Sequence, residues 1–398
     1  MARVLSFVIF IICVNICSSI DDTRSKLSTY DRIRKDGYPS EKYDLITSDG
    51  YILQINRIPR GKNDYLDFFR QRPVVFLQHG LQSSASSFLG IGVNSSLAYY
   101  LADSGFDVWI GNARGVKNSR RHLFLSPDND DTKRRFWDFS FEEVALIDLP
   151  HMIDFALSRT RQKKLHYVGH SQGGTVFLIL NSRKPEYNDK IASAHLLAGV
   201  GYQNDFPNWV LSQAADRTDD ILALTSLFGF VEILAPPRNE KPNLGELIES
   251  VNNMEIPKNK NDLFELIYLI MKTMEEISRA KESLSGAAVK QYAHYGQNIR
   301  DKSFRSFDHG LLGNLLKYGR YTPPEYDLRN IKVNVTMHYT LGDILLHERD
   351  VLAMSEVIPN CKVRKVARKD FSHTDFLLAR DTRELVFDYL IDDLKRRK

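Results

Sequence analysis

Hydrophobic and polar residues follow two different patterns along this chain. Residues 43–47 and 51–58 alternate apolar and polar side chains around the turn sequence Ser48-Asp49-Gly50, which predicts a β-hairpin. Short apolar runs follow, each of a length that suits a buried strand. They are residues 74–77, 108–110, 165–168, 194–197, 333–339 and 363–366.

Segments of helical character separate these runs, among them residues 95–103, 140–159 and 175–181, and residues 375–394 predict a final helix. Strand and helix in turn predict an α/β fold, with a mostly parallel central sheet and helices on both faces.

This alternation stops between residues 202 and 321, where helical periodicity takes over. Residues 219–230 and 263–277 are the clearest apolar helices there, and the second carries a stripe that can pack on the core or face lipid as a lid. We therefore expect a helical cap or lid to interrupt one large domain. The expected parts are a core of residues 20–201, an inserted cap of residues 202–325 and the rest of the core at residues 326–398.

The first nineteen residues have the features of a signal peptide. Arg3 gives a positive start, residues 4–16 form a short apolar stretch, and small residues follow from Cys17. Elsewhere no uninterrupted apolar run is long enough for a transmembrane helix. We expect residues 1–19 to be removed and the chain to enter the secretory pathway. Export makes Asn94 and Asn334, each in an Asn-x-Ser/Thr triplet, candidate glycosylation sites.

Charge and cysteine content narrow the possible chemistry. The net charge of +4 is nearly balanced in a chain that is 26% charged, which does not suggest a nucleic-acid partner. Cys361 is the one cysteine outside the predicted signal peptide, so the exported chain cannot form an internal disulfide. No activating sequence surrounds Cys361, and we interpret it as a structural residue rather than a nucleophile.

One motif points to a particular reaction. The strand-like run at residues 165–168 leads into Gly169-His170-Ser171-Gln172-Gly173, and an apolar helix is expected to follow. Gly-x-Ser-x-Gly between a strand and a helix is the nucleophile elbow of serine hydrolases, in which the glycines leave room for a strained turn. Ser171 is therefore the predicted nucleophile.

The base and the acid are predicted from chain order, which in this fold class runs nucleophile, acid, histidine. His373 lies between the last strand and the last helix, whereas His338 falls inside a strand and His347 in a loop before the last strand. Asp343 directly follows the strand at residues 333–339. Asp350 is a competitor, but its place near a helix start also suits a capping role.

Two backbone N–H groups are expected to stabilise the oxyanion that attack by Ser171 would create. The N–H of Gln172 adjoins the nucleophile. The second donor should come from the loop after the strand at residues 74–77, where Gly80 allows a close approach and Leu81 is the predicted donor. His79 is interpreted as a structural residue.

Several strings in this order resemble the acid lipases related to lysosomal acid lipase and gastric lipase. The resemblance runs from about residue 38 to the end of the chain. The strings are QHGL at 78–81, DVWIGNARG at 107–115, FWDFSFEE at 136–143, LHYVGHSQG at 165–173 and FDHG at 307–310.

The resemblance implies an α/β-hydrolase fold with a helical cap, no metal or organic cofactor, and hydrolysis of triacylglycerols or sterol esters at a lipid–water interface. It also implies a secreted or lysosomal protein, and it matches Ser171, Asp343 and His373 as the triad. The string at 111–115 is expected to brace the core. The loop at 341–347, LGDILLH, departs from the family pattern by lacking one glycine and a second aspartate.

Two other functions stay open on the sequence. One is a carboxylesterase that acts on small soluble esters, which would show no gain in rate when its substrate forms an interface. The other is a catalytically silent lipid carrier, which would bind lipid stoichiometrically without turnover.

Overall fold

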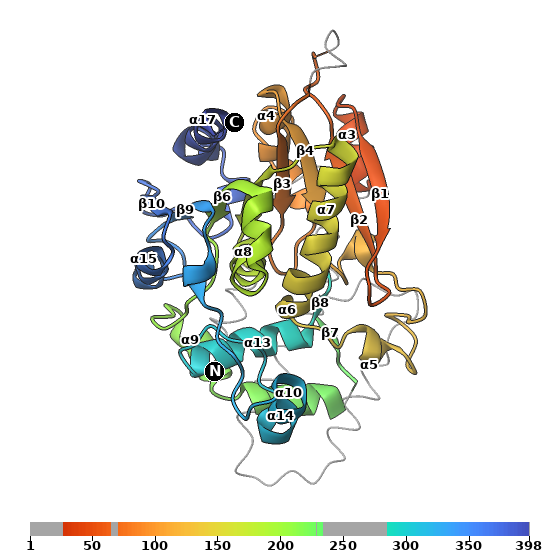
Figure 1. Ribbon diagram of the computed structural model, residues 1–398, viewed down its shortest axis with the longest axis vertical. Helices are drawn as coiled ribbons and strands as arrows, with labels where there is room; N and C mark the ends of the chain where they lie inside the picture. Colours follow the sequence, from red (N-terminus) through yellow and green to blue (C-terminus); the bar gives the residue numbers. More distant parts are fainter. Residues whose placement is uncertain (1–26, 65–70, 228, 234–284, 398) are drawn as a thin grey trace.

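An eight-stranded sheet forms the centre of the described part of the molecule (Figure 1). The computed structural model describes residues 27–64, 71–227, 229–233 and 285–397. The predicted signal peptide at 1–19 and the apolar stripe at 263–277 lie outside these residues. The strands are β1 (Glu41–Ile46), β2 (Ile52–Ile58), β3 (Val74–Gln78), β4 (Asp107–Gly111), β5 (Leu165–His170), β6 (Ile191–Leu197), β9 (Asn334–Tyr339) and β10 (Cys361–Lys365).

The sheet is mostly parallel, as the alternation of strand and helix predicts. Its order is β1-β2-β4-β3-β5-β6-β9-β10. Strand β2 pairs antiparallel with both β1 and β4, and every other pair in the sheet is parallel. The predicted hairpin is thus the antiparallel edge of an α/β-hydrolase sheet. Parallel strands align their carboxyl ends at one edge, where the connecting loops can assemble a site.

Helices cover both faces of the sheet, and the neighbouring strands β5 and β6 show how the faces differ. Successive side chains of a strand point to opposite sides. Tyr167 packs against Phe177 of α8 (Gln172–Arg183), whereas on the other face His195 contacts Tyr389 of α17 (Asp388–Arg396). In Figure 1, α7 (Leu149–Thr160) and α8 lie side by side over the sheet.

The other helices of the core precede the first strand, connect the strands or follow the last one. They are α3 (Thr29–Lys35), α4 (Leu97–Asp103), α5 (Lys133–Phe136), α6 (Phe141–Glu143), α15 (Glu348–Val357) and α16 (Asp375–Leu378). Short 3-10 turns occupy Ala85–Leu89, Lys117–Ser119, Pro185–Lys190 and Leu328–Asn330, and π turns occupy Val144–Asp148 and Arg383–Phe387.

The predicted final helix at 375–394 is wrong as a single element. α16 ends at Leu378, and Ala379 has an extended backbone with ψ 145°. Helical structure resumes only with the π turn at Arg383–Phe387, which leads into α17. The Asp375 carbonyl keeps its helical bond from the Ala379 N–H at 3.1 Å and also accepts from the Thr382 hydroxyl at 2.6 Å, so the chain after α16 is held against that helix. A side-chain bond of this kind to the backbone stabilises a turn in place of a continued helix.

Arg114 braces the loop after β4, in agreement with the role expected for the string at 111–115. Its Nη2 lies 2.7 Å from Asp148 and its Nη1 lies 2.6 Å from Asp49 in the turn of the β1–β2 hairpin. Burial raises the pKa of Asp148, although the guanidinium favours the charged carboxylate. A buried charge is tolerated only when it is paired in this way.

Helices dominate the region between β6 and β9, the part of the chain in which an inserted cap is expected. They are α9 (Trp209–Ala215), α10 (Thr218–Leu227), α13 (Val289–Arg300) and α14 (Gly310–Tyr318). A two-stranded antiparallel ribbon, β7 (Glu232–Ile233) with β8 (Ala287–Ala288), was not expected from the sequence. Throughout the described ranges, every helix is too short or too polar to cross a bilayer.

The face of the sheet that carries α17 holds buried histidines. His166 lies against Ser193, with Nδ1 and the hydroxyl oxygen 2.8 Å apart, and burial lowers the pKa of His166 to about 4. His195 and His338 share a contact of 2.9 Å between Nδ1 and Nε2. These imidazoles are held neutral because burial disfavours their charged form.

We predict that His166 makes the fold less stable in acid. In the unfolded chain a histidine binds a proton below a pKa of about 6.5, whereas in the folded chain it does so only near 4. The contribution of neutral His166 to the free energy of unfolding is complete above pH 6.5 and is lost as the pH falls from there to 4. Between pH 7.5 and 5 this one group should lower the free energy of unfolding by about 2 kcal/mol.

Urea denaturation of the natural chain and a His166→Gln variant at both pH values measures this effect. Glutamine does not titrate and can still bond Ser193. The variant should lose about 2 kcal/mol less than the natural chain over that interval. Equal losses in the two proteins would show that His166 does not couple folding to pH.

Candidate active site

Ser171 occupies a strained turn between β5 and α8. Its backbone has φ 53° and ψ −117°, a conformation that residues other than glycine rarely adopt. The Ser171 N–H donates to the Leu197 carbonyl at 2.9 Å, and the Ser171 carbonyl accepts from Gly174 at 2.8 Å. These bonds hold the turn, and the side chain is left partly exposed at the carboxyl end of the sheet.

The glycines of the motif make this turn possible. A Cβ on Gly173 would lie 2.2 Å from the Gln78 carbonyl oxygen, and a Cβ on Gly169 would lie 2.5 Å from the Gly173 carbonyl carbon. Either atom would collide with backbone that cannot move aside. The close approach brings the end of β3 against the start of α8, and this contact places the Gly80 loop beside Ser171.

The structure brings Ser171, His373 and Asp343 into one chain of hydrogen bonds. His373 Nε2 lies 2.7 Å from Ser171 Oγ, and His373 Nδ1 lies 2.7 Å from Asp343 Oδ2. His373 and Asp343 are buried. The three residues come from the loops after β5, β9 and β10, which meet at one edge because their strands are parallel.

The Asp343 carboxylate is fixed from its other side by the backbone. Its Oδ1 accepts from the N–H groups of Leu345 at 2.8 Å and Leu346 at 3.1 Å. The Oδ2 atom is then free to accept from His373 Nδ1. An ionised carboxylate only accepts, so the proton of a neutral His373 is on Nδ1 and its Nε2 can accept from the Ser171 hydroxyl.

The competing residues lie outside this chain of bonds. Asp350 is in the first turn of α15, where its carboxylate accepts from the backbone N–H groups of Asn204 and Asp205. His347 is the N-cap of the same helix and accepts from Arg349. His338 is buried in β9 against His195. Each therefore has a structural contact that accounts for it.

The two predicted oxyanion donors flank Ser171. Gln172 is the first residue of α8, where an N–H has no acceptor inside the helix. On the other side, a Cβ built on Gly80 would lie 2.9 Å from Ser171 Cβ, so the chain at Gly80 and Leu81 passes directly beside the hydroxyl. Over the described residues, neither the Leu81 nor the Gln172 N–H has a protein acceptor.

Two histidines hold the surrounding loops. His79 Nε2 accepts from the Ala113 N–H at 3.1 Å, and burial lowers the pKa of His79 to about 4. His170 Nε2 donates to the His373 carbonyl at 2.9 Å. Burial, assisted by the nearby His373, lowers the pKa of His170 to about 3, so this ring stays neutral.

Sequence reasoning missed the contact of His170 with His373. The motif marks His170 only as a residue of the elbow, and its partner is 203 residues away along the chain. A second missed support is Thr340, whose hydroxyl donates to the Phe371 carbonyl at 2.9 Å and joins the loops that carry Asp343 and His373. No local pattern indicates either contact.

The remaining candidates lie elsewhere. Cys361 begins β10, and burial raises the pKa of its thiol to about 12, so it is a poor nucleophile. Asn94 is exposed in a turn before α4, and Asn334 is exposed at the start of β9. Across the residues that the structure describes, no group of three histidine, cysteine, aspartate or glutamate side chains is arranged to hold a metal ion.

Comparison with known proteins places the chain among lipases. Residues 29–92 match the family model described as a partial alpha/beta-hydrolase lipase region, and residues 73–225 match that of the alpha/beta hydrolase fold. Lipase 3 of Drosophila melanogaster is 35% identical over 374 residues, which cover 92% of each chain. Gastric triacylglycerol lipase of Bos taurus is 37% identical over 365 residues, which cover 89% of this chain and 88% of that protein.

Human gastric triacylglycerol lipase is similar to the same extent, with 35% identity over 91% of this chain and 89% of its own. These likenesses extend over about nine tenths of the chain, and they agree with the α/β-hydrolase sheet. The chain therefore belongs to the gastric and acid-type lipase family of α/β-hydrolases and is a carboxylic ester hydrolase.

Proposed function

We propose that this protein hydrolyses the ester bonds of neutral lipids, triacylglycerols or sterol esters, with Ser171 as nucleophile, His373 as base and Asp343 as the acid of the triad. The observation that supports this most directly is the pair of 2.7 Å contacts that links the three side chains. Relatives named gastric triacylglycerol lipase support a triacylglycerol as one substrate.

The reaction is a double displacement. His373 Nε2 takes the Ser171 proton as Oγ attacks the ester carbonyl carbon, and the N–H groups of Leu81 and Gln172 stabilise the negative oxygen. The intermediate collapses, and the alcohol leaves with the proton from His373. Water then attacks the acyl-enzyme with His373 again as base, which releases the fatty acid and restores Ser171. Asp343 stabilises the imidazolium in both steps.

The test of the reaction is Ser171→Ala. Removal of the nucleophile should lower the hydrolysis rate by roughly a millionfold, because the triad acts as a unit. The assay uses emulsified trioleoylglycerol, emulsified cholesteryl oleate and a soluble short-chain ester. Highest serine-dependent rates on an emulsion support the lipase, whereas highest rates on the soluble ester would indicate a small-ester carboxylesterase. Stoichiometric lipid binding without turnover in either protein would indicate a lipid carrier.

The choice of acid is tested by two matched variants. Asp343→Asn should lower the rate by about 10⁴, because an amide can donate to Nδ1 and so stabilises the wrong tautomer of His373. Asp350→Asn, seven residues later, should retain turnover per folded molecule, since Asp350 bonds the backbone of Asn204 and Asp205. The reverse ranking would reassign the acid to Asp350.

We also propose that residues 1–19 direct the chain into the secretory pathway, to a secreted or lysosomal destination, and that Asn94 is glycosylated there. Asn94 is exposed in a turn, a suitable position for a bulky glycan. Expression in eukaryotic cells should give a protein whose mass falls on treatment with a glycosidase. Asn94→Gln should reduce this fall in mass, and Asn334→Gln is the matched comparison. A mass unchanged by the glycosidase would reject the proposal.

A further inference from the structure

Helix α14 presents a row of leucines to solvent. The exposed fractions are 69% for Leu311, 75% for Leu312, 41% for Leu315 and 89% for Leu316. Spacings of one, four and five residues place these four side chains on one side of a helix. We call them the leucine ridge. Leucines on one helix face ordinarily pack into a core, and a contiguous exposed set instead marks a surface that binds something.

The opposite side of α14 is anchored by polar contacts. Asn314 is buried, and its Nδ2 donates to the Asp308 carboxylate at 2.8 Å and to the Tyr321 carbonyl at 2.9 Å. Its Oδ1 accepts from the His309 N–H at 2.9 Å. In addition, the Tyr318 hydroxyl donates to the Phe307 carbonyl at 2.9 Å. The leucines are thus held outward by the fixed orientation of the helix.

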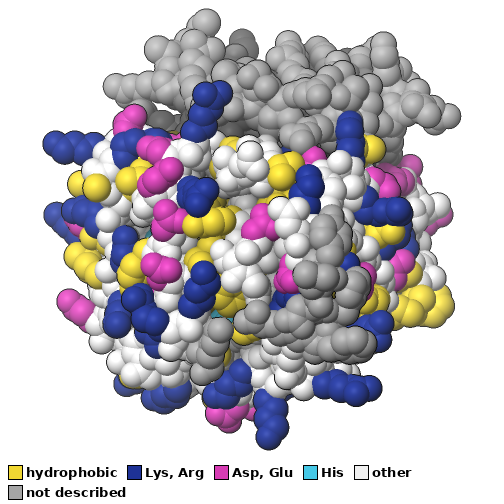
Figure 2. Space-filling view, turned by 90° about the horizontal axis from the view of Figure 1, so that it is seen from above, with side chains coloured by type: hydrophobic (Ala, Val, Ile, Leu, Met, Phe, Trp, Pro, Cys, Tyr) yellow, Lys and Arg dark blue, Asp and Glu magenta, His cyan; other side chains and the backbone are white. Residues whose placement is uncertain are grey.

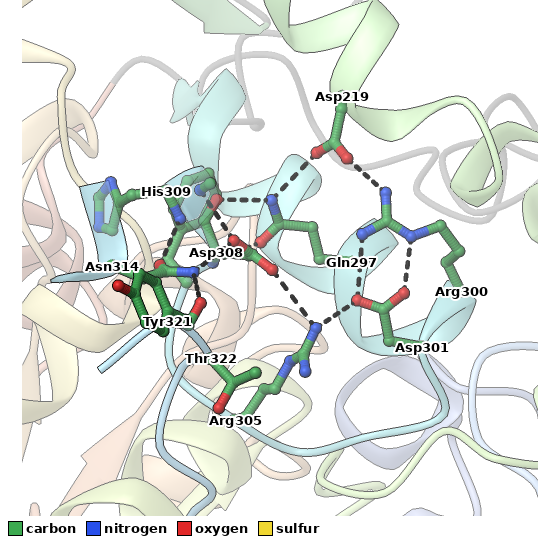
Figure 3. A network of polar contacts seen from close by, with 12 residues as sticks. Asp219, Gln297, Arg300, Asp301, Arg305, Asp308, His309, Asn314, Tyr321 and Thr322 are labelled. Atoms are coloured by element: carbon green, nitrogen blue, oxygen red, sulfur yellow. Dashed lines mark hydrogen bonds and ion pairs between the residues drawn. The ribbon is translucent and has the colours of Figure 1, made fainter. Parts of the chain in front are cut away.

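A wider network joins this anchor to the rest of the cap (Figure 3). Gln297 of α13 accepts from the Asp308 N–H at 2.9 Å and donates to its carbonyl at 3.0 Å. Gln297 also donates to Asp219 of α10 at 3.1 Å, and Arg300 pairs with the same carboxylate. Helices α10, α13 and α14 therefore form one connected unit.

The charged residues of the segment that carries the leucine ridge are both basic, and one of them, Lys317, also lies 3.9 Å from the Glu143 carboxylate of the core. Residues 310–324 contain no aspartate or glutamate, but they include Lys317 and Arg320. The Lys317 side chain is 52% exposed, and Arg320 is exposed as well. Tyr321 is 61% exposed beside them. Leucines with an aromatic ring and flanking cations are the composition of helices that lie in the interface of anionic lipid.

The ridge lies at the end of the molecule that carries the candidate active site. Tyr295 of α13 contacts Thr175 of α8, with 2.8 Å between the hydroxyl oxygens, four residues after Ser171. Gln297, on the same helix, holds the loop before α14. The face seen in Figure 2 shows no comparable row, because its hydrophobic side chains form separate patches among charges of both signs.

From these observations we infer that the leucine ridge of α14, flanked by Lys317 and Arg320, docks this protein on an anionic lipid surface. The leucines enter the acyl region, and the two cations contact the acidic headgroups. The inference rests on the proposed action on neutral lipids, since docking would bring the cap end of the molecule to its substrate. Fatty acids released by hydrolysis would add negative charge to the same surface.

The experiment measures binding without turnover. Full-length protein with Ser171→Ala is co-sedimented with vesicles of phosphatidylcholine containing 30% phosphatidylglycerol, and with vesicles of phosphatidylcholine alone. Addition of Leu312→Gln and Leu316→Gln should weaken the partition onto both kinds of vesicle by at least about tenfold. Lys317→Gln with Arg320→Gln should weaken binding only to the anionic vesicles.

A matched control changes two exposed apolar residues outside the ridge, Ile46 of β1 and Leu352 of α15, which are 56% and 38% exposed. The Ile46→Gln, Leu352→Gln protein should bind both kinds of vesicle like the parent. Circular dichroism and thermal unfolding establish that each variant is folded. If a folded ridge variant binds as tightly as the parent, the inference is wrong.

Two other outcomes can be distinguished from lipid docking, a dimer interface and a failure of the proposed function. If sedimentation equilibrium shows a dimer that only the ridge variant dissociates, and vesicle binding is unchanged, the ridge is an interface between two copies and the lipid inference is overturned. Hydrolysis is measured in parallel with proteins that carry the same other substitutions but keep Ser171. Absence of turnover would reject the proposed function, whereas the vesicle result, obtained without catalysis, would still decide the role of the ridge.

Discussion

The close contact between the end of β3 and the start of α8 is the constraint on which the site depends. With no side chain on Gly173, the Gln78 carbonyl can approach the first turn of α8, and Ser171 can keep its φ of 53°. The same contact brings Gly80 against Ser171 and so sets the two backbone N–H donors on either side of the hydroxyl. The strain is local, and the buried sheet around it supplies the stability that maintains it.

Around this turn, the supporting contacts are mainly between loops that are distant in sequence. His170 holds the carbonyl of His373, Thr340 holds that of Phe371, and the Asp343 carboxylate is oriented by two N–H groups of its own loop. Each contact restrains a loop that brings one member of the site. The geometry of the three side chains therefore reflects the packing of the whole edge of the sheet.

Much of this architecture follows from local sequence patterns. Each apolar run overlaps a strand, and chain order predicts the three residues that the structure brings together, because strand period and loop position are local properties. The break at Ala379 could not be predicted, since it depends on how the Thr382 hydroxyl bonds the Asp375 carbonyl. The exposure of Leu312 and Leu316 was equally hidden, because an apolar helix pattern does not say which face another element covers. The contact of His170 could not be predicted either, because its partner His373 lies 203 residues away along the chain.

The order of the strands has a consequence for the time at which the protein becomes active. Ser171 is translated in the first half of the chain, but Asp343 and His373 follow strands that are made last and that complete one side of the sheet next to β6. Under the proposed mechanism, a nascent or truncated chain that lacks β9 and β10 has the nucleophile elbow but no base. Its Ser171 hydroxyl would then be an ordinary alcohol, so ester hydrolysis would begin only after the last strands had joined the sheet.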